Sequence, residues 1–242
     1  MQWVLYLVVP LLLSTVITPI VNRIGIKLDI YAHTNERTIH HGKIARVGGI
    51  AIYVAFILSM TFFMDGIDDA FRGLLIGSTV MFIGGLIDDM LDLKPILKIA
   101  FQVLAAYILI KVGGVELGVI HLPFGIVINM GVVSFLVTFV WIIGISNAIN
   151  LVDGLDGLAG GITTIVFLTI AAISVADDRP DIAMISLIIA GSTLGFLFFN
   201  FHPAKIFMGD CGALFLGFVV AAISLMGFKG STFITLGFPM LL

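Results

Sequence analysis

Six aspartates at the ends of apolar stretches are the residues in this sequence best suited to chemistry. They are Asp88, Asp89, Asp92, Asp153, Asp156 and Asp210. Carboxylates gathered beside apolar segments repel one another and are expensive to dehydrate, so a positive charge is expected among them. Carboxylate and amide oxygens suit a hard divalent ion such as Mg²⁺. The pattern therefore predicts a magnesium site built from residues that are distant in sequence.

Two asparagines support that prediction. Asn147 and Asn150 lie near the end of an otherwise apolar stretch, and a buried amide needs a partner, which a metal ion or a polar ligand would provide. Asp153 and Asp156 are three residues apart, a spacing that places both on one face if the segment is helical. The alternative for these two is a loop with two Asp-Gly turns. For the Asp88–Asp89 pair the alternative is simple capping of a helix at an interface.

Cations accompany the acids. Lys98 follows Asp88 by ten residues, and Arg37 and Arg46 lie in a basic segment early in the chain. Such side chains are suited to phosphate binding, although contact with lipid headgroups would also explain them. Phe207, just before the last aspartate, could stack on a nucleobase or anchor the chain at an interface. A divalent ion, several acids and several cations together point to phosphoryl-group chemistry on a lipid-soluble partner.

The composition indicates what kind of protein must position these groups. Of the 242 residues, 60% are apolar and only 11% are charged, and the formal net charge is −3. A soluble domain carries about 25% charged residues. These figures exclude a disordered chain, a coiled coil and a partner of nucleic acids, and the single cysteine, Cys211, excludes a disulfide scaffold. A polytopic membrane protein remains.

Apolar runs of a length suited to a bilayer follow one another along the chain. A helix crosses the hydrocarbon core in about 20 residues, and no open sheet satisfies its backbone in lipid. The predicted spans are 1–22, 47–64, 73–87, 99–110, 126–152, 157–176, 182–201 and 211–228. A ninth opens near Ser231 and is cut off at Leu242. We expect an all-α polytopic transmembrane bundle with about eight complete spans and a truncated ninth, forming one domain over 1–242.

The distribution of basic residues indicates the orientation of the spans. With the loops numbered in order, the odd loops contain eight Lys or Arg residues and the even loops contain four. Because loops rich in Lys and Arg stay in the cytoplasm, the odd loops are expected there and the N-terminus outside. The six aspartates then meet at the cytoplasmic face, whereas the even loops look like plain connectors.

Four motifs resemble one family of membrane enzymes. They are E-R-T-I-H-H-G-K-I-A-R-V-G-G (36–49), G-G-L-I-D-D-M-L-D-L-K-P-I-L-K (84–98), N-A-I-N-L-V-D-G-L-D-G-L-A-G-G (147–161) and F-M-G-D-C-G-A-L-F-L-G-F (207–218). In this order, and over nearly the whole chain, they resemble the polyprenyl-phosphate N-acetylhexosamine-1-phosphate transferases. The first motif resembles the first cytoplasmic loop of the branch that uses UDP-N-acetylglucosamine.

The resemblance implies a reaction and its partners. The family transfers a sugar 1-phosphate from a UDP-N-acetylhexosamine to undecaprenyl phosphate in the cell membrane, giving undecaprenyl-pyrophosphoryl-sugar and UMP. The first motif favours N-acetylglucosamine, and the product would begin a cell-wall or surface polysaccharide. Mg²⁺ is the implied cofactor, for which Mn²⁺ could substitute, and a homodimer is compatible with the resemblance. The resemblance is compatible with two mechanisms, direct attack by the lipid phosphate and attack through an aspartyl intermediate.

The resemblance also implies roles for the site residues. Asp88 and Asp89 would be the catalytic residues that serve the lipid phosphate, with Asp88 as the base or orienting group. Asn150 and Asp210 would hold Mg²⁺. The phosphate-binding residues would be Lys98 and Arg46. The residues of the nucleotide-sugar site would be Asn147, Asp153, Asp156, Phe207 and His40.

Several positions depart from the family pattern. Thr38, Lys43 and Ala45 stand where the first motif usually has one lysine and two prolines, and Cys211 stands where Thr or Ser is usual. Family members continue through two more helices and a His-rich loop, so we expect this chain to be C-terminally incomplete and, by itself, inactive.

A transporter is the alternative function. Intramembrane acids often mark ion pathways, so a cation- or proton-coupled transporter would also explain the aspartates. That hypothesis predicts acids near the middle of the bilayer, within broken helices, rather than at helix ends on one side.

Overall fold

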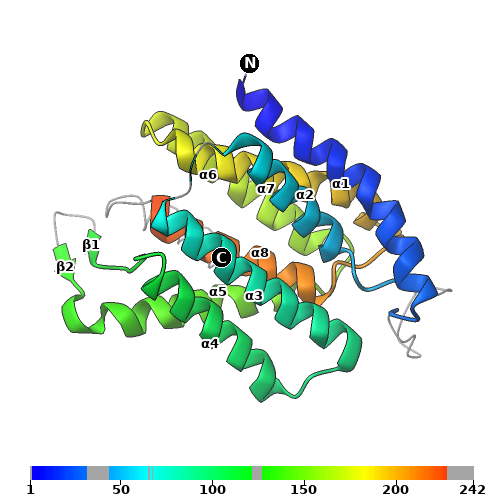
Figure 1. Cartoon of the computed structure of the whole chain (residues 1–242), viewed down its shortest axis with the longest axis horizontal. Coiled ribbons are helices and arrows are strands. Elements are labelled where there is room, and N and C mark those ends of the chain that lie inside the picture. Colours follow the sequence, from blue (N-terminus) through cyan, green and yellow to red (C-terminus); the bar gives the residue numbers. More distant parts are fainter. Residues whose placement is uncertain (1, 32–43, 65, 67, 122–126, 228–242) are drawn as a thin grey trace.

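The bundle in Figure 1 is a computed structural model that describes residues 2–31, 44–64, 66, 68–121 and 127–227. Its helices are α1 (Gln2–Lys27), α2 (Gly49–Phe63), α3 (Asp69–Leu91), α4 (Pro95–Lys111), α5 (Ser134–Val152), α6 (Leu158–Ala176), α7 (Pro180–Asn200) and α8 (Gly209–Gly227). Two short antiparallel strands, β1 (Val119–His121) and β2 (Val127–Asn129), precede a 3₁₀ turn, η2 (Gly131–Val133). The predicted all-α class is confirmed, with this hairpin as a small addition.

Helix lengths agree with a multi-pass membrane protein. Among the described residues, six helices are long and apolar enough to cross a membrane, namely α1, α3, α5 together with η2, α6, α7 and α8. Helix α2 has 15 residues and α4 has 17, which is less than a full span. Each of the first eight predicted spans overlaps one helix. The ninth, from Ser231, lies outside the described residues.

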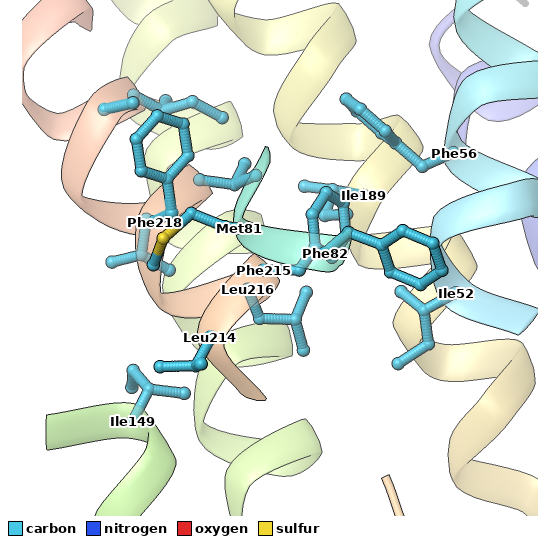
Figure 2. Close-up of a cluster of buried hydrophobic side chains, with 14 of the residues drawn as sticks. Ile52, Phe56, Met81, Phe82, Ile149, Ile189, Leu214, Phe215, Leu216 and Phe218 are labelled. Carbon is cyan, nitrogen blue, oxygen red and sulfur yellow. The ribbon is translucent and has the colours of Figure 1, made fainter. Parts of the chain in front are cut away.

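Helix α8 forms the centre of the bundle. It contacts α2, α3, α5, α6 and α7, and nearly all of its side chains are buried. A helix that is apolar on every side is stable only when other elements surround it. Figure 2 shows side chains of the neighbouring helices beside those of α8, among them Ile52, Phe56, Met81, Phe82, Ile149 and Ile189. Because Asp210 lies in the first turn of α8, this core also fixes a predicted site residue.

Glycines allow α8 to approach its neighbours closely. A Cβ atom at Gly85 of α3 would lie 2.5 Å from the carbonyl oxygen of Asp210, and one at Gly49 of α2 would overlap the backbone of Gly212. Small residues at helix contacts bring backbones together in membrane proteins. Gly49 and Gly85 therefore serve close packing of α2 and α3 against α8.

The structure corrects two local predictions. The fifth helix begins at Ser134 rather than near Ile126, because the chain forms the β1–β2 hairpin and η2 first. This even loop is therefore more than a plain connector. Asp153 and Asp156 do not share a helix face, because α5 ends at Val152 and a turn leads to α6. The Asp-Gly turn alternative is correct there, and Gly157 takes a left-handed φ of 72° before α6 begins.

Candidate functional site

Three charged side chains from α3, α4 and α8 meet at one end of the bundle. The Lys98 ammonium group donates to a carboxylate oxygen of Asp210 at 3.0 Å and also contacts the carboxylate of Asp88. Asp88 in addition accepts a 2.8 Å hydrogen bond from the Leu93 N–H. Both carboxylates are buried. The positive charge of Lys98 therefore offsets the cost of burying two like charges side by side.

A second cation reaches Asp210 from the segment before α2. Arg46 Nη2 donates to Asp210 Oδ1 at 3.1 Å, and Arg46 Nε lies 3.5 Å from Asp89 Oδ1. The segment is held beside the start of α8, where the Phe207 N–H donates to the Ala45 carbonyl at 2.9 Å. Burial lowers the pKa of Arg46, but Asp89 and Asp210 outweigh it and raise the pKa above its ordinary value. Both oxygens of Asp210 are thus paired with cations.

Asp89 is directed at the backbone of α8. Its two carboxylate oxygens accept hydrogen bonds from the N–H groups of Asp210 at 2.8 Å and Cys211 at 2.9 Å. The side chain is fully buried. The first N–H groups of a helix have no partner within the helix, and an anion there is favoured by the helix dipole. Asp89 therefore holds the first turn of α8 in place, and its expected role toward the lipid phosphate stays a prediction.

A cavity of about 520 Å³ opens beside Asp210. Its lining residues are Arg46, Asn150, Leu151, Asp153, Gly154, Leu155, Asn200, Phe207, Gly209 and Asp210. Five predicted site residues are therefore brought together here, and the volume lies within the range of small-molecule sites. Among the described residues, the Asn150 side chain forms no hydrogen bond. Its amide is available to a ligand.

Asp153 is the most strongly perturbed acid outside the helices. Burial, and then the negative charges of Asp210 and Asp89, raise the pKa of Asp153 to about 7, while Arg46 opposes the shift. A carboxyl group that titrates near neutral pH in a cavity is typical of functional sites. It can accept a proton or a hydrogen bond from a ligand at physiological pH.

Asn200, at the end of α7, was not identified from the sequence. Its side-chain oxygen accepts a 3.1 Å hydrogen bond from the Gly157 N–H, and its nitrogen donates to the Ile206 carbonyl at 2.9 Å. Asn200 thus connects the turn after α5 to the segment before α8, and both segments contribute residues to the cavity lining. The signal that could have revealed it is a lone amide at the end of an apolar run.

Three residues predicted for the nucleotide sugar lie outside this cavity lining or outside the described part of the chain. Asp156 accepts a 3.1 Å hydrogen bond from the Ala204 N–H and pairs with His202 at 3.0 Å. Asn147 instead bonds to Gln102 of α4. His40 falls outside the described residues. Gln102 is a second residue that the sequence reasoning missed, and its signal is a lone amide within an apolar run.

The location of the acids also tests the transporter alternative. Asp88 and Asp89 lie in the last turn of α3, Asp210 in the first turn of α8 and Asp153 directly after α5. The transporter hypothesis predicted acids near the middle of the bilayer, and these four lie at helix ends. The arrangement instead gathers Arg46, Asp153 and Asp210 around a cavity, with Lys98 paired to Asp210.

Known proteins resemble this chain over most of its length. Residues 71–228 match the model of glycosyl transferase family 4. A probable undecaprenyl-phosphate N-acetylglucosaminyl 1-phosphate transferase of Bacillus subtilis (strain 168) is 37% identical over 237 residues, which are 97% of this chain and 66% of that protein. A decaprenyl-phosphate N-acetylglucosaminephosphotransferase of Mycobacterium leprae (strain TN) is 37% identical over 230 residues, 86% of this chain and 56% of its own length.

A further relative is named for a different sugar. A phospho-N-acetylmuramoyl-pentapeptide-transferase of Streptococcus uberis is 35% identical over 189 residues, 73% of this chain and 56% of that protein. The chain thus spans between 56% and 66% of the length of these three relatives. The family match runs from α3 to the end of α8 and so includes Asp88, Lys98, Asn150 and Asp210. The chain belongs to glycosyl transferase family 4.

Proposed function

We propose that the protein transfers N-acetylglucosamine 1-phosphate from UDP-N-acetylglucosamine to undecaprenyl phosphate. The products are undecaprenyl-pyrophosphoryl-N-acetylglucosamine and UMP, and the step begins a cell-wall or surface polysaccharide. The names of the Bacillus and Mycobacterium relatives support the acceptor class and the sugar. The observation that carries the proposal is the pairing of Asp210 with both Lys98 and Arg46 at the edge of a cavity. Cations held in place by buried carboxylates are suited to binding phosphate groups.

The proposed site faces the cytoplasm. It lies at the end of the bundle that carries Arg46, Lys94 and Lys98, and the positive-inside rule assigns such an end to the cytoplasm. In Figure 1 the β1–β2 hairpin lies at the left, away from the connection between α3 and α4. Lys94 belongs to that connection, and Lys98 to the first turn of α4. This orientation puts the N-terminus outside.

Mg²⁺, replaceable by Mn²⁺, is the proposed cofactor, and the residues present fit it. Among the described residues, no group of three or more His, Cys, Asp or Glu side chains forms a metal site by itself. Mg²⁺ usually binds through one or two protein oxygens together with water and substrate phosphates. Asn150, whose amide has no partner among the described residues, and Asp210 line the same cavity and would hold the ion. When bound, it would supply charge neutralisation of the pyrophosphate and of the departing UMP.

The side chains of the site divide the remaining work. In the transfer, an oxygen of the acceptor phosphate forms a bond to the phosphorus that carries the sugar, and the bond from that phosphorus to UMP breaks. Lys98 contacts both Asp88 and Asp210, so it can bring the two anionic substrates together. Asp88 would orient the acceptor phosphate, and Arg46 would bind the pyrophosphate. Asp153 and Phe207, both in the cavity lining, would contact the nucleotide sugar.

Release of UMP from UDP-N-acetylglucosamine tests the proposal in the full-length protein. Release should require both undecaprenyl phosphate and Mg²⁺ and should stop on addition of EDTA. Asp210→Asn should lower it by at least about 100-fold, because the anchor of two cations is weakened. Asp69→Asn is the matched control, since Asp69 is exposed at the opposite end of α3. Absence of UMP release under all these conditions would contradict the proposal.

A further inference from the structure

A buried amide of α4, Gln102, and an exposed amide of α5, Asn147, join the two helices one turn from the site. Gln102 Nε2 donates to Asn147 Oδ1 at 3.1 Å, and Asn147 Nδ2 donates to Gln102 Oε1 at 2.7 Å. Gln102 is 1% exposed. Among the described residues, these are the only side-chain hydrogen bonds between α4 and α5. The pair therefore ties the two helices together at the end nearer the site, and Lys111 over the Phe135 ring joins them at the other end.

The amide pair lies one turn from two site residues. Gln102 follows Lys98 by four residues on α4, and Asn147 precedes Asn150 by three residues on α5. Residues three or four apart lie on the same helix face, with their Cβ atoms about 5–6 Å apart. Since α4 begins and α5 ends at the site, a shift at the amide pair would be passed directly to Lys98 and Asn150.

The site residues on these helices converge on one group. Lys98 binds the carboxylate of Asp210, and Asn150 lines the cavity beside the same residue. α4 otherwise packs mainly on α3, where Gly84 of α3 leaves space for Phe101 and Gly77 approaches the backbone of Ala105. Packing on α3 fixes the distance from Lys98 to Asp88, and α8 links α3 to α5. The α4–α5 contact adds a direct connection between the helix of Lys98 and the helix of Asn150.

We propose that Gln102 and Asn147 are a positioning pair that holds Lys98 and Asn150 in register for the transfer reaction. The proposal rests on the proposed function and changes the role of Asn147 from contact with the nucleotide sugar to support of the residues that make such contacts. The Asn147 amide also donates to the Ile143 carbonyl one turn earlier at 2.8 Å. The Asn147 amide nitrogen therefore donates to two protein acceptors, Gln102 Oε1 and the Ile143 carbonyl oxygen.

A side-chain swap tests the pair. A reciprocal amide pair requires one long and one short side chain across a fixed gap, and Gln102→Asn combined with Asn147→Gln preserves their summed length. Gln102→Asn alone leaves the two amides too far apart, and Asn147→Gln alone leaves them too crowded. We expect each single variant to lower kcat for UMP release about 10- to 100-fold, the effect of a misplacement of about 1 Å, with KM for UDP-N-acetylglucosamine within about twofold. The double variant should return kcat to within about threefold of wild type.

The control and the second measurement separate positioning from folding. Asn129→Gln lengthens an exposed amide of the hairpin, far from the site, and should leave kcat unchanged. Melting temperatures in detergent should fall in both single variants and recover in the double variant, which tests the pairing without any activity. Recovery of the melting temperature without recovery of kcat would show a purely structural contact and overturn the positioning role.

Two further outcomes would also contradict the proposal that Gln102 and Asn147 act as a positioning pair. If Gln102→Asn has full activity while Asn147→Gln is inactive alone and in the swap, Asn147 contacts substrate directly. If neither single substitution changes the melting temperature, the pairing itself is wrong. A wild-type protein that releases no UMP would instead contradict the proposed function, and the melting temperatures would still decide whether the two amides are coupled.

Discussion

The carboxylate of Asp89 accepts a 2.8 Å hydrogen bond from the backbone N–H of Asp210, across 121 residues of chain. This bond joins the last turn of α3 to the first turn of α8, the helix at the centre of the core. Its neighbour Asp88 is directed at Lys98 instead. Adjacent residues on a helix point about 100° apart, so one aspartate supports the backbone of the site and the other lies among its charged groups.

Replacing Asp89 should destabilise the protein. Asp89→Ala removes the acceptor of two N–H groups at the start of α8 and leaves Arg46 with one partner fewer. Loss of an N-terminal cap costs about 0.5–2 kcal/mol, and unpaired buried N–H groups add to that cost. We expect a lower melting temperature in detergent together with weaker UMP release. Asp92→Asn, at an exposed left-handed position that Asn tolerates, should change neither, and equal effects of the two substitutions would contradict this role.

Gly85→Ala should damage the contact between α3 and α8. The new Cβ would lie 2.5 Å from the Asp210 carbonyl oxygen and 2.6 Å from Cys211 Cα, both backbone atoms that cannot easily move. Overpacking of this kind costs about 1–3 kcal/mol, and displacement of Asp210 should lower activity as well. Gly161→Ala in α6 meets no atom within 4 Å and should stabilise the helix by up to about 1 kcal/mol. Thermal unfolding of both variants compares them, and a stable Gly85→Ala protein would disprove the close approach.

Lys98→Met should abolish most of the activity. The substitution keeps the length of the side chain but leaves the buried carboxylates of Asp88 and Asp210 without the cation between them. We expect UMP release to fall by about 100- to 1,000-fold, the usual loss when one stabilising group is removed from a site. Lys98→Arg should retain more activity because the charge remains. Lys94→Met, at an exposed position before α4, is the control, and loss of activity there would indicate a general effect of charge.

The pH dependence of stability should report on Asp153. Its pKa is about 7 in the folded protein and about 3.9 in an unfolded chain, so the folded state binds more protons between these values. Stability from this group is therefore present below about pH 4 and is lost as the pH rises toward 7, by up to about 4 kcal/mol. We therefore expect the melting temperature of wild type, measured in EDTA and expressed relative to that of Asp153→Asn, to fall as the pH is raised from 4.5 to 8. Parallel curves for the two proteins would refute the raised pKa.

The helices could be predicted from the sequence because span length is a local property. An apolar run of the right length must form a helix in lipid, so Ile182–Phe201 could be identified as a span without any knowledge of its neighbours, and α7 covers Pro180–Asn200. The hairpin was missed because strands of three residues carry no clear period. The acidic clusters at the helix ends were likewise visible as charges that interrupt apolar runs.

The partners within the site were decided by tertiary structure alone. Nothing in the sequence distinguishes Asp88 from Asp89, yet one contacts Lys98 and the other holds the start of α8. Asn147 and Asn150 look alike within one motif, but only Asn150 lines the cavity. Which way each side chain points depends on helix rotation and on the packing of α3, α4 and α5 around α8. Those contacts join residues far apart in the chain, so no local pattern encodes them.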